Sequence, residues 1–373
     1  MKAVCISCFD YHATRMKSIT EYLCDKGYDT RYIITDFQHF SKARYQAKYN
    51  VNTTQLHVPA YMKNVSAARL LSHYVFANKV YKKLNEIKPD IIYCMFPPNM
   101  LVKRVMQYKY KTGVKVIFDC YDMWPESFPY KKYGKLLSLP FDIWRNFRDK
   151  YIEKADMLVC VSNALRDTFL TNYKGVPITV LMPSISIEGM PRYTFDIENK
   201  ITLCYLGNIN HITDIELGIE LLSKVAQKRP VTLHIIGGGK NHDDFVQKLE
   251  ASRIQVISHG VVFDDEIKKY IFGQCNFGLN IPREWVKSTM SLKSIEYMNV
   301  GLPFINSGVG DTYDIVNDNN IGISIDRVDI DKTVKTILSV SNKELRNMHD
   351  CCVAYYINNF ANQNLDTIFD SII

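Results

Sequence analysis

Apolar residues recur along the chain in short runs, and longer segments with helical spacing separate them. Residues 3–8 form an apolar run, residues 15–26 have helical spacing that ends at Gly27, and residues 30–34 are rich in β-forming types. The alternation continues to about residue 182 and then restarts. It predicts strands at 3–8, 30–34, 91–95, 115–119, 155–161 and 178–182, and then at 201–206, 231–236, 254–258, 277–281 and 303–306.

Strict alternation of near-continuous apolar strands with helices is typical of parallel sheets covered on both faces. A chain of 373 residues exceeds the usual span of one hydrophobic core. We therefore predict an α/β fold of two facing Rossmann-like domains with a cleft between them. The expected domains are 1–185 and 186–350, with a C-terminal helix at 351–373 that packs back toward the first domain.

Basic residues concentrate in the first half. Residues 1–185 carry 28 basic and 15 acidic side chains, whereas residues 186–373 carry 18 and 24. This bias favours an anionic partner, with lipid headgroups, a phosphorylated acceptor and nucleic acid as candidates. A merely solvated surface is the alternative. The basic amphipathic stretches at 63–88, 103–115 and 131–154 suit a domain resting on anionic lipid.

The chain offers no stretch of apolar residues long enough to span a bilayer, and its first apolar run is too short for a signal peptide. We therefore expect a cytoplasmic protein, peripheral at most on the inner face of the membrane.

The segment 288–303 is the clearest candidate for a ligand-binding or catalytic site. Its hydroxyl-rich start opens a helix that Gly301 and Pro303 close. The start of a helix offers free N–H groups to a diphosphate, and Lys293 adds positive charge there. Glu296 lies less than two turns into the helix, within reach of ribose hydroxyls. The alternative is an ordinary N-capped helix with an exposed glutamate.

This segment resembles a known element. Lys293, residues 296–298 (Glu-Tyr-Met) and residues 301–303 (Gly-Leu-Pro) are similar to the K-x-x-E-Y-M-x-x-G-x-P element of retaining glycosyltransferases of family 4, which have the GT-B fold. The resemblance implies that Glu296 holds the donor's ribose and takes a catalytic role. It assigns the diphosphate to the helix start, formed by Ser291, Leu292 and Lys293.

The family's fuller pattern has a second glutamate eight positions before Glu296, over the donor sugar. This chain has Ser288 there, and Glu284 lies four residues further upstream.

Other donor-side elements follow from the same resemblance. Gly207 and Asn208 match the loop that opens the donor domain, and Gly237 and Gly238 match the glycine turn under the nucleotide. The loop at Asn208 lacks the family's basic residues. Positive charge is therefore expected from Arg283, Lys287 and Lys293.

Residues 122–126, Asp-Met-Trp-Pro-Glu, are similar to the D-x-W-P-E element of a branch of these enzymes that builds surface polysaccharides. The resemblance makes Asp122 a catalytic candidate and puts Trp124 and Glu126 on the acceptor side, together with Arg15. Alternatively, Trp124 plugs the domain edge and Asp122 only shapes the loop.

These elements together predict a glycosyltransferase that moves a sugar from a nucleotide-diphosphate donor to an acceptor hydroxyl, with retention, in polysaccharide or glycolipid assembly. The expected partners are the nucleotide sugar, a glycan or lipid-linked acceptor and an anionic membrane surface, with no nucleic acid. No cofactor or metal is expected, since a helix start and Lys293 can balance the diphosphate charge without one. The alternatives are a non-catalytic GT-B protein and a GT-B nucleotide-sugar epimerase. The glycines at 237–239 lack the G-x-G-x-x-G spacing of a nicotinamide site.

Overall fold

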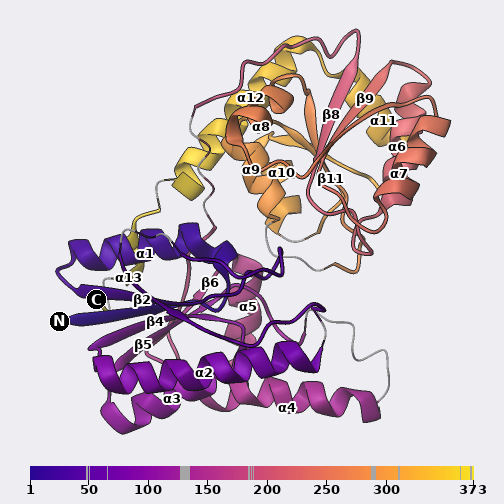
Figure 1. The fold of residues 1–373 in the computed structure, drawn as a ribbon. Coiled ribbons are helices and arrows are strands. Elements are labelled where there is room, and N and C mark those ends of the chain that lie inside the picture. The colour runs from indigo at the N-terminus through magenta and orange to yellow at the C-terminus, as the bar shows by residue number, and fades with distance from the viewer. Residues whose placement is uncertain are drawn as a thin grey trace. The chain divides into compact units, whose positions relative to one another are not determined.

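The computed structural model divides the chain into two compact units. Unit 1 comprises Met1–Met182 and Asn364–Ile373, and unit 2 comprises Pro183–Gln363 (Figure 1). The structure describes the whole chain except residues 48, 50, 65, 127–134, 184, 186, 188, 287–290, 310, 362, 370 and 371, and it leaves out the side chains of residues 11, 135–138, 164 and 311.

Unit 1 is built on a parallel sheet of seven strands, counted over the described residues, in the order β3-β2-β1-β4-β5-β6-β7. The strands are β1 (Lys2–Ile6), β2 (Asp29–Thr35), β3 (Asn52–Leu56), β4 (Ile91–Phe96), β5 (Lys115–Cys120), β6 (Met157–Cys160) and β7 (Ile178–Val180). The helices are α1 (Ala13–Asp25), α2 (Ala67–Ile87), α3 (Asn99–Thr112), α4 (Lys135–Ile152), α5 (Asn163–Asn172) and α13 (Leu365–Phe369), with a 3₁₀ turn, η1, at Asp10–His12.

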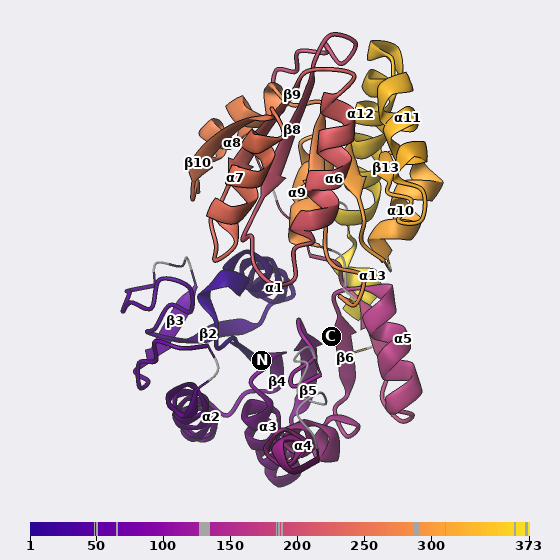
Figure 2. The ribbon, with the colours of Figure 1, turned by 90° about the vertical axis from the view of Figure 1, so that its right-hand side faces the viewer.

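The side chains of β1 alternate between two cores. Val4 and Ile6 pack with apolar residues of α2 and α3, whereas Ala3 and Cys5 pack with residues of α1 and the C-terminal segment. Figure 2 shows α2, α3 and α4 side by side along one face of this sheet. Both faces are therefore covered, as the apolar strands predicted.

Unit 2 repeats this plan with a six-stranded parallel sheet among its described residues, in the order β10-β9-β8-β11-β12-β13. Its strands are β8 (Ile201–Leu206), β9 (Val231–Ile236), β10 (Gln255–Gly260), β11 (Phe277–Asn280), β12 (Phe304–Asn306) and β13 (Gly322–Ser324). Its helices are α6 (Ile215–Ala226), α7 (His242–Ala251), α8 (Asp265–Gly273), α9 (Leu292–Asn299), α10 (Asp311–Asn319), α11 (Ile330–Ser339) and α12 (Asn342–Tyr356), which a π-helical turn, η3 (Ile357–Ala361), follows.

The predicted α/β class with two Rossmann-like halves and parallel sheets is confirmed. The sequence pattern did not predict β3 and β13. Both are edge strands, and β3 carries the polar sequence NTTQL because only one side of an edge strand is paired. No helix in the described part of the chain is long and apolar enough to cross a membrane.

Candidate active site

The glycine loops of unit 2 meet at the carboxyl ends of β8 and β9. Gly207 donates its N–H to the carbonyl of Ile236 at 2.8 Å. Gly237 has a φ of 139°, and a Cβ there would overlap the carbonyl oxygen of Gly207. Glycine is thus required for the two loops to pack together. Gly238 has open space where a side chain would be.

The start of α9 lies beside this loop. The hydroxyl of its N-cap residue, Ser291, accepts the N–H of Ser294 at 3.4 Å. The Lys293 side chain lies over Gly207, with its ammonium 4.1 Å from the centre of the Tyr205 ring. Leu292 is about half exposed. The structure therefore brings Lys293 and the helix start to the glycine loop.

Glu296 forms an ion pair that the sequence did not indicate. Lys268 of α8 donates to its carboxylate at 2.8 Å, and each side chain is only 13% exposed. Lys268 also pairs with Asp265 at 2.8 Å. Burial lowers the pKa of Lys268, but its bonds to Asp265 and Glu296 outweigh burial and raise this pKa overall. Lys268 is therefore a firmly charged group beside Glu296.

Tyr297 fixes α9 to the sheet. Its hydroxyl donates to the carbonyl of Cys204 and accepts the N–H of Leu206, both at 2.9 Å. Its ring packs on Gly278, where a Cβ would clash with it. The tyrosine of the E-Y-M element thus has a structural role, and it holds Glu296 and Lys293 at the end of β8.

The remaining donor-side candidates are more dispersed. Arg283 pairs with Glu216 at 2.9 Å and lies 3.9 Å from Asp214, so its charge is already balanced by carboxylates. The main-chain carbonyl of Asn208 accepts the Tyr205 hydroxyl at 3.2 Å. Lys287 lies outside the described residues, as does Ser288.

In unit 1, the D-x-W-P-E element is held by its own side chains. The indole N–H of Trp124 donates to the Asp122 carboxylate at 2.5 Å. Glu126 accepts two hydrogen bonds, at 2.6 and 3.0 Å, from the buried guanidinium of Arg148. Burial acts to raise the pKa of Glu126, but these bonds outweigh it and lower the pKa. Asp122 therefore shapes the loop at least through Trp124, and Glu126 anchors it to α4.

Arg15 has an internal partner as well. It binds the buried Asp119 carboxylate through two hydrogen bonds, at 2.6 and 3.0 Å, and donates to the carbonyl of Leu181 at 2.8 Å. Tyr93 completes the group by donating to Asp119 at 2.5 Å. These contacts account for Arg15 without a ligand.

The carboxyl end of the unit 1 sheet holds a group of residues that we call the histidine cluster: His12, His39, His73 and Arg69. All four are buried. The rings of the three histidines each lie within 5.4–6.1 Å of the Phe9 ring. The Arg69 guanidinium lies 4.0 Å from the centre of the Trp124 ring and so joins the cluster to the D-x-W-P-E element.

Sequence reasoning missed this cluster because its members are scattered. His12 follows β1, His39 follows β2, and Arg69 and His73 lie in the first turns of α2. The sequence did offer one signal for this cluster, which is the position of its members relative to the strands and helices. All come after strands or at a helix start, where the loops of a parallel sheet converge.

The histidines are held neutral. Burial, helped by the charge of Arg15, lowers the pKa of His12 to about 3, and burial with the charges of Arg69 and Lys42 lowers that of His39 to about 3. Burial, followed by the charge of Arg69, lowers the pKa of His73 well below its ordinary value, and neither of its ring nitrogens has a partner among the described residues. Arg69 thus supplies the positive charge of the cluster at neutral pH.

The described residues contain no group of three or more His, Cys, Asp or Glu side chains placed to hold a metal ion.

Family comparisons agree with this arrangement. The model described as Glycosyltransferase Family 4 matches residues 12–188, and the model described as Glycosyl transferases group 1 matches residues 200–343. The two matches together span most of the chain. The chain belongs to these glycosyltransferases and has the GT-B fold. The family resemblance seen in the sequence is confirmed.

Solved structures share this fold along the whole chain. Sucrose-phosphate synthase (tll1590) from Thermosynechococcus elongatus has a TM-score of 0.73 at 13% identity, covering 100% of this chain and 97% of its own. Anabaena Alr3699/HepE in complex with UDP and glucose has a TM-score of 0.66 at 13% identity, covering 100% of both chains. The lipopolysaccharide outer core galactosyltransferase WaaB has 0.64 at 15%, also covering 100% of both. No curated protein matches the chain in sequence.

The depressed histidine pKa values predict a stability that falls in acid. Below about pH 6.5 the unfolded chain protonates these histidines, whereas folded unit 1 does not, so stability present above pH 6.5 is lost as the pH falls toward about 3. For His12 alone, the free energy of unfolding falls by about 1.4 kcal/mol per pH unit over this range. We expect His73→Gln to reduce the fall in Tm between about pH 7.5 and 4.5.

The matched control is His211→Gln, because His211 is exposed and lies in unit 2, outside the histidine cluster. It should keep the wild-type dependence of Tm on pH. Equal slopes for the wild type and His73→Gln would contradict a neutral, buried His73.

Proposed function

We propose that this glycosyltransferase moves a sugar from a nucleotide-diphosphate donor to a hydroxyl of a glycan or lipid-linked acceptor, with retention at the anomeric carbon. The observation that carries the proposal is the grouping of Lys293, Glu296 and Lys268 at the start of α9, beside the loop at Gly207. A cationic group and a helix start suit a diphosphate, while a carboxylate suits ribose hydroxyls.

The donor would place its diphosphate against the N–H groups at the start of α9 and the Lys293 ammonium. Gly207 adds no side chain of its own beside the Lys293 ammonium, so the backbone can approach the diphosphate closely. Glu296 would accept hydrogen bonds from the ribose, with Lys268 fixing the orientation of its carboxylate. Because Anabaena Alr3699/HepE is described with UDP and glucose, UDP-glucose is the first donor to test.

The reaction breaks the bond between the anomeric carbon and the diphosphate oxygen and forms one to the acceptor oxygen. The leaving diphosphate keeps the electron pair and gains negative charge, while the acceptor hydroxyl loses its proton. Lys293 and the helix start would stabilise the leaving group from fixed positions, the kind of electrostatic term that is usually the largest in catalysis. This arrangement needs no metal ion.

We place the acceptor at the carboxyl end of the unit 1 sheet, between the D-x-W-P-E element and the histidine cluster. His73, whose ring nitrogens have no partner among the described residues, offers hydrogen bonds, and Arg69 offers a charge suited to a phosphate group on the acceptor. Glu126 of the D-x-W-P-E element is bound by Arg148, so we propose that the other carboxylate of the element, Asp122, contacts the acceptor hydroxyl. An anionic, phosphate-linked acceptor agrees with the basic first half of the chain and with a role in polysaccharide or glycolipid assembly.

A surface of α2 supports contact with a membrane. We call it the α2 surface: Met62, Leu70, Leu71 and Tyr74, which are 72%, 49%, 53% and 47% exposed. Leu70, Leu71 and Tyr74 share one face of the helix, because residues three and four apart are neighbours. Exposed lysines lie in or just before the same helix, at 63, 79 and 82. We propose that this surface rests on anionic lipid on the cytoplasmic side of the membrane.

Loss of the Glu296 carboxylate tests the donor site. We expect Glu296→Ala to lower kcat/KM by more than about 100-fold, on the scale of about 3 kcal/mol for one key contact, since the ribose loses its acceptor. Release of the nucleoside diphosphate is the readout. Lys268 keeps its bond to Asp265 in this variant, so the fold should persist.

Glu266→Ala is the matched control, because Glu266 lies on α8, is 83% exposed and pairs only with Lys269 among the described residues. It should retain wild-type activity. A Glu296→Ala enzyme with normal kcat/KM would show that the Glu296–Lys268 pair is structural and would remove the main support for this donor site.

The α2 surface predicts binding to anionic vesicles. We expect the Leu70→Asp/Leu71→Asp variant to bind phosphatidylglycerol vesicles about tenfold or more weakly than the wild type in co-sedimentation, because burying a leucine contributes about 1.5–3 kcal/mol. Val328→Asp, at a position in unit 2 that is 98% exposed, is the control and should bind normally. Equal binding by both variants, or no preference over phosphatidylcholine, would contradict the proposed surface.

A further inference from the structure

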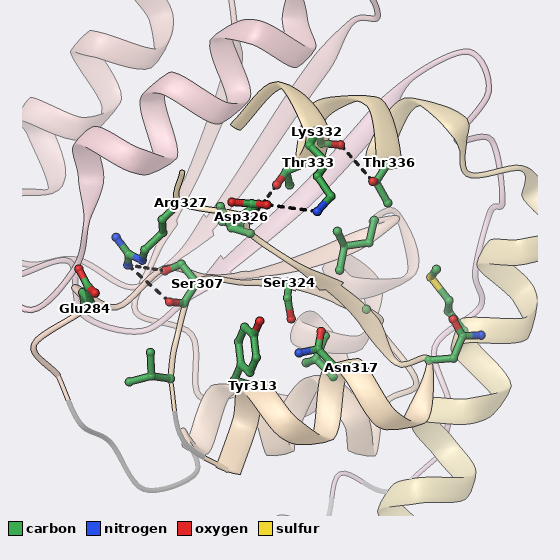
Figure 3. Close-up of a pocket in the computed structure, with 17 residues that line it drawn as sticks. Glu284, Ser307, Tyr313, Asn317, Ser324, Asp326, Arg327, Lys332, Thr333 and Thr336 are labelled. Atoms are coloured by element: carbon green, nitrogen blue, oxygen red, sulfur yellow. Dashed lines mark hydrogen bonds and ion pairs between the residues drawn. The ribbon is translucent and has the colours of Figure 1, made fainter. Parts of the chain in front are cut away.

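A cavity of about 640 Å³ lies in unit 2 beside β13, the edge strand of the sheet. Residues of α10, α11 and β13 line it, and Figure 3 shows the two helices on either side of the strand. Its volume is within the range of roughly 300–1,000 Å³ that is typical of small-molecule sites. No role in the proposed transfer has been assigned to it.

The strand edge offers main-chain groups to the cavity. Phe304 donates to the carbonyl of Ile321 at 3.3 Å, and Ile325 donates to that of Asn306 at 2.8 Å. The peptide groups of residues 321 and 325 therefore point toward β12. Gly322 and Ser324 alternate with these residues along the strand, so their peptide groups point away from β12, toward the open edge of the sheet. Gly322 and Ser324 both line the cavity.

A buried hydroxyl and an exposed amide also line the cavity. The Ser324 hydroxyl is buried and has no hydrogen-bond partner among the described residues. In Figure 3 it points toward Tyr313 and Asn317 of α10. Asn317 is exposed, and Tyr313 is 43% exposed. A buried hydroxyl with no partner costs free energy, and a polar ligand would remove that cost.

The charges around the cavity cancel. Its charged lining residues are two acids and two bases: Glu284, Asp326, Arg327 and Lys332. Lys332 pairs with Asp326 at 3.3 Å, and Arg327 pairs with Asp214 at 2.8 Å. The lining thus carries no net charge that would attract a phosphate or a nucleotide.

We propose that this cavity binds a neutral saccharide unit, at a site separate from the donor site at the start of α9. A saccharide presents many hydroxyls, each a donor and an acceptor, which match the Ser324 hydroxyl, the Asn317 amide and the peptide groups of Gly322 and Ser324. The Tyr313 ring offers an apolar face to the C–H groups of a sugar ring. This inference does not depend on the donor chemistry proposed above.

Saturation-transfer difference NMR on the full chain tests the site directly. The probes are methyl α-D-glucopyranoside, methyl α-D-galactopyranoside and N-acetylglucosamine, each measured with and without excess UDP. We expect at least one probe to bind equally well in both conditions. The Tyr313→Ala/Asn317→Ala variant should bind that probe about tenfold or more weakly.

The matched control is Asp314→Ala/Asp318→Ala, which changes two exposed residues of the same helix that do not line the cavity. It should bind the probe as the wild type does. The proposal is wrong if no probe binds, if UDP displaces the probe, or if the Tyr313→Ala/Asn317→Ala variant binds normally. Each readout is independent of transfer activity, so a failed donor proposal leaves this test intact.

Discussion

The Tyr297 hydroxyl joins α9 to β8, and the arrangement of the donor side depends on this link. One oxygen accepts the N–H of Leu206 and donates to the carbonyl of Cys204, so the helix cannot shift along the strand without leaving buried peptide groups unpaired. The ring fits only because residue 278 is glycine. Lys293 and Glu296, four and one positions before the tyrosine, are thereby held at the glycine loop.

In unit 1, the D-x-W-P-E element is likewise held in place by hydrogen bonds of its own side chains. Each carboxylate of this element has an internal contact: Asp122 accepts the Trp124 indole, and Glu126 binds the buried Arg148. Trp124 in turn covers the guanidinium of Arg69. The element therefore fixes the loop and connects it to buried, neutral histidines. The element can both fix the loop and face an acceptor, because a side chain that contacts an acceptor must also be held by a rigid loop.

The fold follows from the amino-acid sequence more completely than the site does. Buried parallel strands are nearly all apolar, so β8, β9 and β11 were predicted within a residue or so, whereas the short or polar edges β13 and β3 were not. The α9 element was found because its residues are contiguous. Lys268 and Arg69 were not, because they reach Glu296 and Trp124 only through tertiary packing. Their charges could be counted from the sequence, but their partners could not.

The proposed transfer requires unit 2 to hold a nucleoside diphosphate at the start of α9. The most direct measurement is the Tm of the wild type and of Lys293→Met with UDP, GDP and ADP, each beside its monophosphate. We expect one diphosphate to raise the wild-type Tm, because a ligand bound only by the folded state stabilises it. Its monophosphate should raise the Tm less, and the Tm of Lys293→Met should respond only weakly to the diphosphate. An unchanged Tm with every nucleotide would show that unit 2 holds no nucleoside diphosphate and would favour a GT-B protein without a donor site.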